Sequence, residues 1–111
     1  MDIITRLTAL NEQLMQSLKL YKVNGLALAE AEKAYKILLR QEALKLRDEG
    51  MAIGMIDKTV YGIPTVAEAR FKRDCAEAVY KANAEAINTY KLQIRITESQ
   101  IAREWGTNES A

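Results

Sequence analysis

The feature that most constrains the fold is a row of large side chains at seven-residue intervals in the first half of the chain. Leu7, Leu14, Tyr21, Leu28 and Tyr35 form this row. A seven-residue repeat places its members on one face of an α-helix. The repeat therefore predicts a helix over about residues 3–49. The flanking positions on the same face are held by Leu10, Leu18, Ala31, Leu38 and Leu39.

Asn24-Gly25 lies inside this predicted helix, although that residue pair is typical of turns. A turn would reset the phase of the repeat, yet the seven-residue spacing continues unchanged across it. We therefore predict one continuous helix in which Gly25 costs about 1 kcal/mol relative to alanine. Two helices joined at Asn24-Gly25 are the alternative. At the far end, Gly50 is expected to close the helix in a left-handed conformation.

Residues 50–65 interrupt the helical pattern with three glycines and the only proline of the chain, Pro64. Their remaining side chains are unusually apolar for a loop. We expect a connecting loop that packs across the end of the bundle, with room for one helical turn around residues 55–59. Thr65 and Glu68 then match a capping box, which predicts that a second helix starts near Val66.

The second helix is predicted over residues 66–105, with a frayed tail at 106–111. Apolar residues occupy two of its faces, and two apolar faces need two partners. One face is assigned to the stripe of Phe71, Cys75, Val79, Ala82, Ala86, Tyr90, Ile94 and Ile101. The other face carries Tyr80, Ile87, Leu92 and Ile96.

The 111 residues contain only one proline and five glycines, the residues that most disfavour helices. We therefore predict a single all-α domain, 1–111, folded as a long antiparallel helical hairpin. A register that sets Ala31 and Ala34 against Ala82 and Ala84 brings small side chains together. A lone hairpin buries little surface, so we expect two copies to pair into a homodimeric four-helix bundle. The expected oligomer interface is Tyr80, Ile87, Leu92 and Ile96.

The absence of histidine and the single cysteine limit the chemistry of the chain. They exclude Ser-His and Cys-His catalysis and histidine-containing zinc or di-iron sites. Nucleotide-binding and calcium-binding sequence motifs are also missing. We therefore expect a protein that is not an enzyme, with no catalytic residue, bound metal or cofactor. Cys75 is interpreted as a small buried hydrophobe rather than a reactive thiol.

The charge pattern suggests an alternative function. Sixteen basic and fifteen acidic residues nearly cancel, and no signal peptide or membrane span is recognisable, so we expect a soluble intracellular protein without a membrane partner. Two basic clusters nevertheless flank the connecting loop. The alternative function is therefore an accessory nucleic-acid-binding protein. Its predicted contacts are Lys33, Lys36, Arg40 and Arg47 in the first helix and Arg70, Lys72 and Arg73 in the second.

Residues 46–51 (LRDEGM) and 66–105 resemble a group of small uncharacterised helical proteins encoded by phages and prophages of Gram-positive bacteria. The resemblance implies a phage-derived protein in the cytoplasm of the bacterial host, near replication and recombination functions, and it supplies no active residues. The leading expectation is a non-catalytic interaction or adaptor protein that self-associates and binds a phage or host protein.

Overall fold

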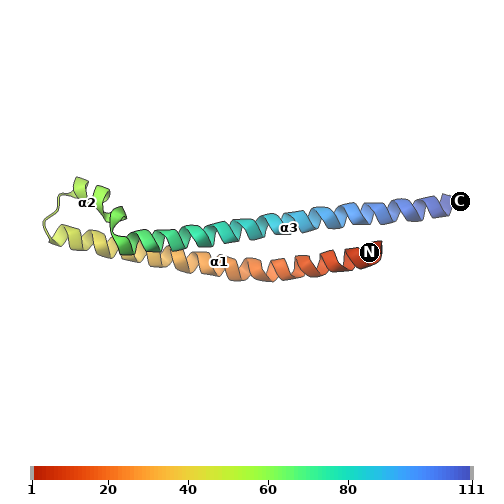
Figure 1. Cartoon of the computed structure of the whole chain (residues 1–111), viewed down its shortest axis with the longest axis horizontal. Coiled ribbons are helices and arrows are strands. Elements are labelled where there is room, and N and C mark those ends of the chain that lie inside the picture. The colour runs from red at the N-terminus through yellow and green to blue at the C-terminus, as the bar shows by residue number, and fades with distance from the viewer. Residues whose placement is uncertain (1, 111) are drawn as a thin grey trace. The chain divides into compact units, whose positions relative to one another are not determined.

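The computed structural model describes residues 2–110, and the side chains of residues 2–106. Every regular element in this part of the chain is helical, which confirms the all-α prediction. The elements in chain order are α1 (Ile3–Asp48), α2 (Ile53–Thr59), the 3₁₀-helix η1 (Val60–Gly62) and α3 (Pro64–Ser110) (Figure 1).

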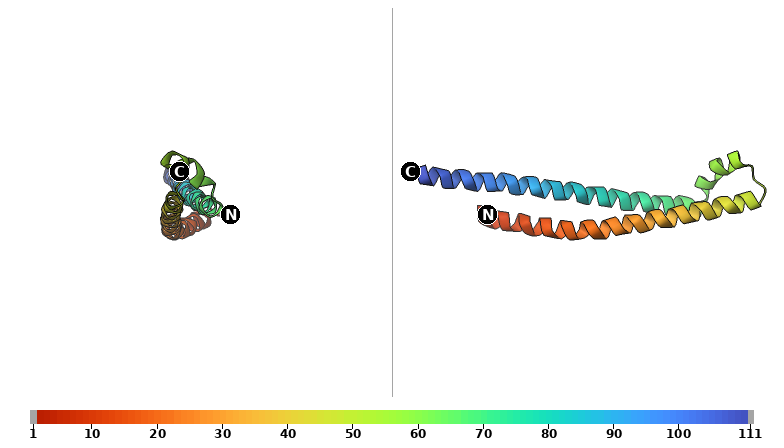
Figure 2. Two further views of the ribbon diagram at one scale, coloured as in Figure 1. Left: turned by 90° about the vertical axis from the view of Figure 1, so that its left-hand side faces the viewer. Right: turned by 180° about the vertical axis from the view of Figure 1, so that it is seen from behind.

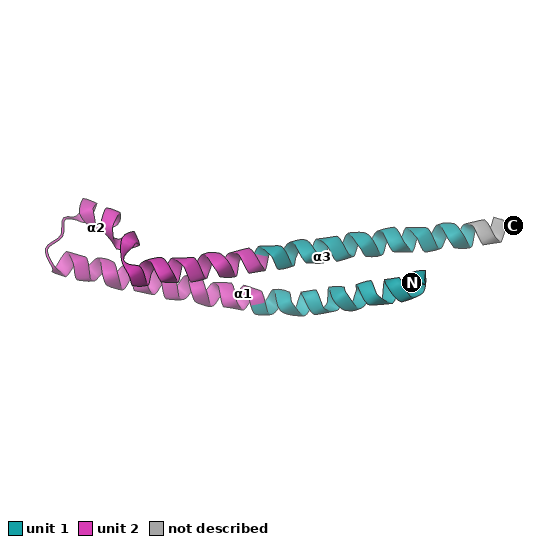
Figure 3. Ribbon diagram, viewed as in Figure 1, with its two compact units in different colours: residues 1–23, 81–111 teal, residues 24–80 magenta. Residues whose placement is uncertain are grey.

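The chain divides into two compact units, each built from parts of both long helices (Figure 3). Unit 1 combines residues 1–23 with 81–111, and unit 2 is the continuous segment 24–80. Within each unit the α1 and α3 segments run antiparallel and side by side (Figures 1 and 2). The predicted antiparallel pairing of two long helices is therefore confirmed.

Unit 1 is held together by a narrow row of buried side chains between its two helices. Leu10 and Ile87 are buried, and the two most buried polar side chains of α3, Asn83 and Thr97, lie in phase with Ile87. Asn83 Nδ2 donates a hydrogen bond of 3.0 Å across the pair to the carbonyl oxygen of Ser17. Asn83, Ile87 and Thr97 are four and ten residues apart, which fits the alternating steps of three and four residues in a coiled-coil seam.

The helix α1 continues without a break through Asn24-Gly25, as the sequence predicts. Gly25 has no special backbone conformation, because Gly50 is the only residue with positive φ among those described. A β-carbon on Gly25 would lie 3.8 Å from Cε1 of Tyr80, which is an ordinary contact distance. Nothing around Gly25 therefore requires a glycine.

Gly50 has the predicted left-handed conformation, with φ of 90°. Its backbone N–H donates to Arg47 O at 3.0 Å, and the N–H of Met51 donates to Leu46 O at 3.1 Å. These two bonds form a Schellman motif with glycine at the C′ position, which satisfies carbonyl groups that the end of the helix leaves unpaired. The motif redirects the chain after α1.

The predicted loop over 50–65 is helical for most of its length, because α2 and η1 occupy it, and α2 includes the helical turn expected around residues 55–59. These short helices fold back beside the last turns of α1 (Figures 1 and 2). Ile56 and Val60 are buried there, and Val60 joins Tyr35 and Val66 in the core of unit 2. The partly buried apolar side chains around this core are Leu38, Leu39, Ala43, Leu46, Ile63 and Ala69.

This folding back changes the register of the long helices. Because α2 and η1 cover the end of α1, α3 begins beside Leu38 instead of beside the last turn of α1. The predicted contact of Ala31 and Ala34 with Ala82 and Ala84 is therefore wrong. Ala31 and Ala34 instead line one groove with Ala69.

The ends of α3 also differ from prediction. The helix starts at Pro64, and the Ala67 N–H donates to Ile63 O at 2.9 Å. Thr65 therefore lies inside the first turn and is not the capping residue of a capping box, since proline suits the first helical position. At the other end α3 continues to Ser110, past the expected end at 105, because no proline follows to stop it. Residue 111 lies outside the described residues.

Candidate functional site

The described residues hold no group of three or more acidic or cysteine side chains able to bind a metal ion. Within the same residues, no helix has the combination of length and apolar character that a membrane crossing needs. The candidate functional features that the described residues offer are surfaces. They comprise the outward face of α3, the basic residues near α2, and two hollows in unit 2.

The outward face of α3 carries large apolar side chains that its partner helix does not cover. In unit 2, Phe71 is 62% exposed and Val79 is 54% exposed, and Cys75 between them is also exposed. In unit 1, Leu92 and Ile96 are 52% and 50% exposed. Large apolar side chains that recur on one exposed helix face are typical of an interaction surface.

The sequence-based assignment of the two faces of α3 is partly wrong. Ile87, predicted at an oligomer interface, is buried within unit 1 at 7% exposure, and Tyr80 is half-buried in unit 2. Conversely, Phe71 and Cys75, predicted to pack against the first helix, are exposed. Of the predicted interface residues, only Leu92 and Ile96 are outward-facing.

The reason is geometric. Four residues advance an α-helix by about 400°, so a stripe traced in repeated four-residue steps winds around the helix axis. From Phe71 to Ile94 this winding amounts to about 140°. The inner row instead alternates steps of three and four residues, as from Val66 to Ala69 and Arg73. Hydrophobicity alone does not identify this inner row, because Arg73, Asn83 and Thr97 are polar.

The four basic residues predicted on the first helix are all exposed on α1, at Lys33, Lys36, Arg40 and Arg47. Among the described residues none of them forms an ion pair, a hydrogen bond or a ring contact. The structure thus leaves this basic row available to an external anionic group.

The basic residues of the second helix are differently placed. The Arg73 guanidinium lies 4.7 Å from the ring centroid of Tyr35 and donates to Asp74 Oδ1 through Nη2 at 2.7 Å. The hydrogen bond with Asp74 is the main cause that raises the pKa of Arg73. Arg70 lies 5.7 Å from the ring centroid of Tyr61. Both arginines are thus already engaged within unit 2, which weakens their predicted role as nucleic-acid contacts.

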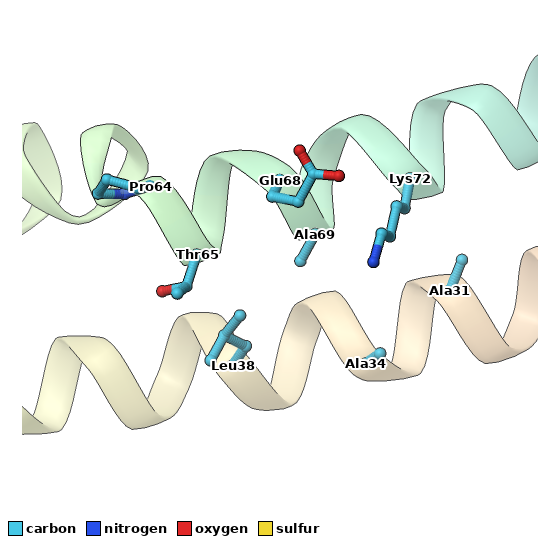
Figure 4. Close-up of a pocket in the computed structure, with 8 residues that line it drawn as sticks. All are labelled: Ala31, Ala34, Leu38, Pro64, Thr65, Glu68, Ala69 and Lys72. Atoms are coloured by element: carbon cyan, nitrogen blue, oxygen red, sulfur yellow. The ribbon is translucent and has the colours of Figure 1, made fainter.

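A groove between α1 and α3 in unit 2 encloses about 480 Å³ (Figure 4). Its walls are mainly the small side chains of both helices, and Lys72 reaches from α3 toward α1 at one end (Figure 4). Lys72 is thus a wall of this groove as well as an exposed basic residue. The lining residues are Ala31, Ala34, Leu38, Pro64, Thr65, Glu68, Ala69 and Lys72.

A second hollow of about 310 Å³ lies between the end of α1 and α2, also within unit 2. Its floor is aliphatic, and its charged members are two arginines and one aspartate. We refer to it as the Arg40–Arg47 hollow, lined by Arg40, Ala43, Leu44, Arg47, Ile53, Ile56 and Asp57. Sequence analysis did not predict this hollow, because it expected only one helical turn, around residues 55–59, within the connecting loop.

Comparison with known proteins gives no further guide to the function. The chain matches no protein-family model, no curated protein and no solved structure.

Proposed function

We propose that this chain is a non-catalytic helical interaction protein that self-associates through the outward face of α3. The observation that carries the proposal is that Phe71 and Val79 stay more than half exposed while the inner row of the same helix is covered. Full burial of one such side chain would contribute about 1.5–3 kcal/mol of favourable free energy. A second apolar surface packed on this face would recover that free energy.

A second copy of the chain is the partner that this face fits. Phe71 and Val79 lie four residues on either side of Cys75. Two such segments packed antiparallel about a twofold axis at Cys75 set Phe71 of each copy against Val79 of the other. The face is therefore self-complementary, as an isologous interface requires. With α1 and α3 from each copy, the proposed dimer contains four long helices, the number expected from the sequence for a homodimer of hairpins.

The exposed side chains at this face are few, which sets the expected strength. Stable interfaces bury about 1,200–2,000 Å² in total, and three side chains from each copy provide less. We therefore propose a reversible dimer with a dissociation constant in the micromolar range. Leu92 and Ile96 in unit 1 offer additional apolar area to the same or another partner.

Sedimentation equilibrium over a series of protein concentrations tests the proposal. The unmodified chain should move from monomer to dimer, and Phe71→Glu should remain monomeric because a buried unpaired carboxylate opposes association. Leu26→Glu is the matched control, since Leu26 on α1 is 60% exposed and lies away from α3's outward face. It should dimerise like the unmodified chain.

Oxidative cross-linking supplies an independent readout, because Cys75 is the only cysteine and is exposed. A mild oxidant should form the Cys75–Cys75 disulfide readily in the unmodified chain and much more slowly in Phe71→Glu. A chain that is monomeric well above micromolar concentration would contradict the proposal. A dimer that survives Phe71→Glu would show that a different surface associates.

The resemblance of residues 46–51 and 66–105 to phage-encoded proteins supports a setting in which such a dimer meets phage or host proteins in the bacterial cytoplasm. That setting is part of the proposal. It is tested by affinity capture from infected or lysogenic cells, with Phe71→Glu as the comparison.

A further inference from the structure

The Arg40–Arg47 hollow combines an apolar floor with unpaired cationic walls. Ile56 is buried at 7% exposure, whereas Ile53 is 75% exposed and Leu44 is 46% exposed. Large aliphatic side chains thus remain accessible at the mouth of the hollow. A volume of about 310 Å³ is close to the lower limit for small-ligand pockets, which suits one or two side chains of a partner.

The charges of the hollow favour an anionic partner. Arg40 and Arg47 are seven residues apart on α1, which places them two helical turns, or about 10 Å, apart along the axis. Neither guanidinium has an ion pair or hydrogen bond among the described residues. Lys33 and Lys36 extend the same basic row along α1 away from the hollow. A carboxylate-bearing chain could therefore follow the row while an apolar side chain enters the hollow.

From this arrangement we infer that the Arg40–Arg47 hollow binds an acidic, amphipathic peptide segment of another protein. Its carboxylates pair with Arg40 and Arg47, and a large aliphatic side chain packs on Leu44, Ile53 and Ile56. Arginine is well suited to this role because its planar guanidinium binds carboxylates through two parallel hydrogen bonds.

Nucleic acid fits the same hollow less well. No aromatic side chain lines it, so an inserted base would have no ring to stack on. The aliphatic floor instead favours burial of an aliphatic side chain. The hollow is also separate from the outward face of α3, so this inference goes beyond the proposed function.

Fluorescence anisotropy with a synthetic peptide tests the inference. The probe is a fluorescein-labelled peptide with leucines one helical turn apart and glutamates elsewhere. Two control peptides replace the leucines by serine or the glutamates by glutamine, and a fluorescein-labelled oligothymidine strand tests the nucleic-acid alternative. Binding of the probe should weaken as salt rises, because exposed ion pairs are screened.

The variant Arg40→Glu/Arg47→Glu should weaken binding of the probe by about tenfold or more, because both positions then repel carboxylates. The matched control is Lys19→Glu/Lys22→Glu, which makes the same charge change at exposed positions of α1 in unit 1 and should leave binding within about twofold. Ile53→Ser should also weaken binding, since Ile53 is 75% exposed and its replacement keeps the charge of the hollow.

Three results would overturn the inference. They are equal binding of the serine-substituted peptide, equal effects of the two charge-reversal variants, and binding of oligothymidine in preference to the probe. Phe71→Glu should bind the probe normally, so failure of self-association and failure of this inference can be told apart. Far-UV circular dichroism checks that each variant keeps its helical structure.

Discussion

Asn83 and Ser17, 66 residues apart in the sequence, are joined by a 3.0 Å hydrogen bond from the Asn83 side-chain amide to the Ser17 backbone carbonyl oxygen. Both residues are buried to 9% exposure within unit 1. A buried polar contact across a helical seam fixes the register of the two helices, because any shift would leave the amide without this partner. The bond therefore defines how the α1 and α3 segments of unit 1 pair.

Replacing Asn83 by alanine should lower the free energy of unfolding by about 1–2 kcal/mol, because the cross-helix hydrogen bond is lost and a small void is left. Urea denaturation followed by circular dichroism measures the change. Asn88→Ala is the matched control on the exposed side of α3 and should change stability by less than about 0.5 kcal/mol. Equal effects of the two substitutions would show that the Asn83 bond contributes nothing.

Two glycine-to-alanine substitutions should have opposite signs. Gly25→Ala should raise stability by about 0.5–1 kcal/mol, since the helical backbone suits alanine and the new β-carbon meets Tyr80 at 3.8 Å. Gly50→Ala should lower stability by about 1 kcal/mol, because φ of 90° is strained for any residue with a β-carbon. Thermal and urea unfolding of the pair provide the measurement, and a loss of stability in Gly25→Ala would contradict the geometry at that site.

Val66 and Val60 form the centre of the core of unit 2, with exposures of 0% and 3%. Val66→Ala and Val60→Ala should each lower the free energy of unfolding by about 2 kcal/mol through lost burial and a residual cavity. The loss of unfolding free energy in the double variant should differ from the sum of the two single losses, because both side chains belong to one cluster with Tyr35. Val23→Ala, at a position 60% exposed, should have almost no effect. Strict additivity would mean that α2–η1 and α3 do not share a core.

Thr97 is only 1% exposed, and its hydroxyl donates to the Gln93 carbonyl oxygen at 2.8 Å. Thr97→Val should leave stability unchanged or raise it by up to about 1 kcal/mol, because a buried hydroxyl is replaced by a methyl group of similar size. Thr97→Ala should lower it by about 1–2 kcal/mol because it leaves a cavity. Urea denaturation measures both variants.

Thr89 provides the control for Thr97, since its hydroxyl makes the same type of bond to Glu85 O at 3.0 Å on an exposed surface. Thr89→Val should change stability by less than about 0.5 kcal/mol. A large loss of stability in Thr97→Val would indicate that the buried hydroxyl has a further partner.

The sequence was sufficient to predict what depends on local pattern. The seven-residue repeat around Leu14 and Tyr35 identified a continuous helix through Asn24-Gly25, and Gly50 marked its end. The face of α3 that packs inward was less predictable. Its inner row includes the polar side chains Arg73 and Asn83, while the outer row includes Phe71, so average hydrophobicity does not separate the two faces.

The site near α2 could not be predicted for a different reason. A helix of seven residues makes only two turns, too few for a periodic signal. Its position depends on where Ile56 and Val60 are buried, which is a tertiary property. The basic residues Arg40 and Arg47 were identified correctly as exposed, but the aliphatic floor beside them became visible only once α2 was folded back onto α1.

The segment formed by α2 and η1 lies beside the last turns of α1, beyond the start of α3 (Figure 1). It therefore behaves as a structural part of unit 2 and cannot be shortened or lengthened as freely as a surface connection. Replacing it by a flexible glycine-serine linker would preserve chain connectivity and yet leave the apolar side of the last α1 turns facing water. Insertions aimed at tagging or splitting the protein should for the same reason avoid residues 53–62.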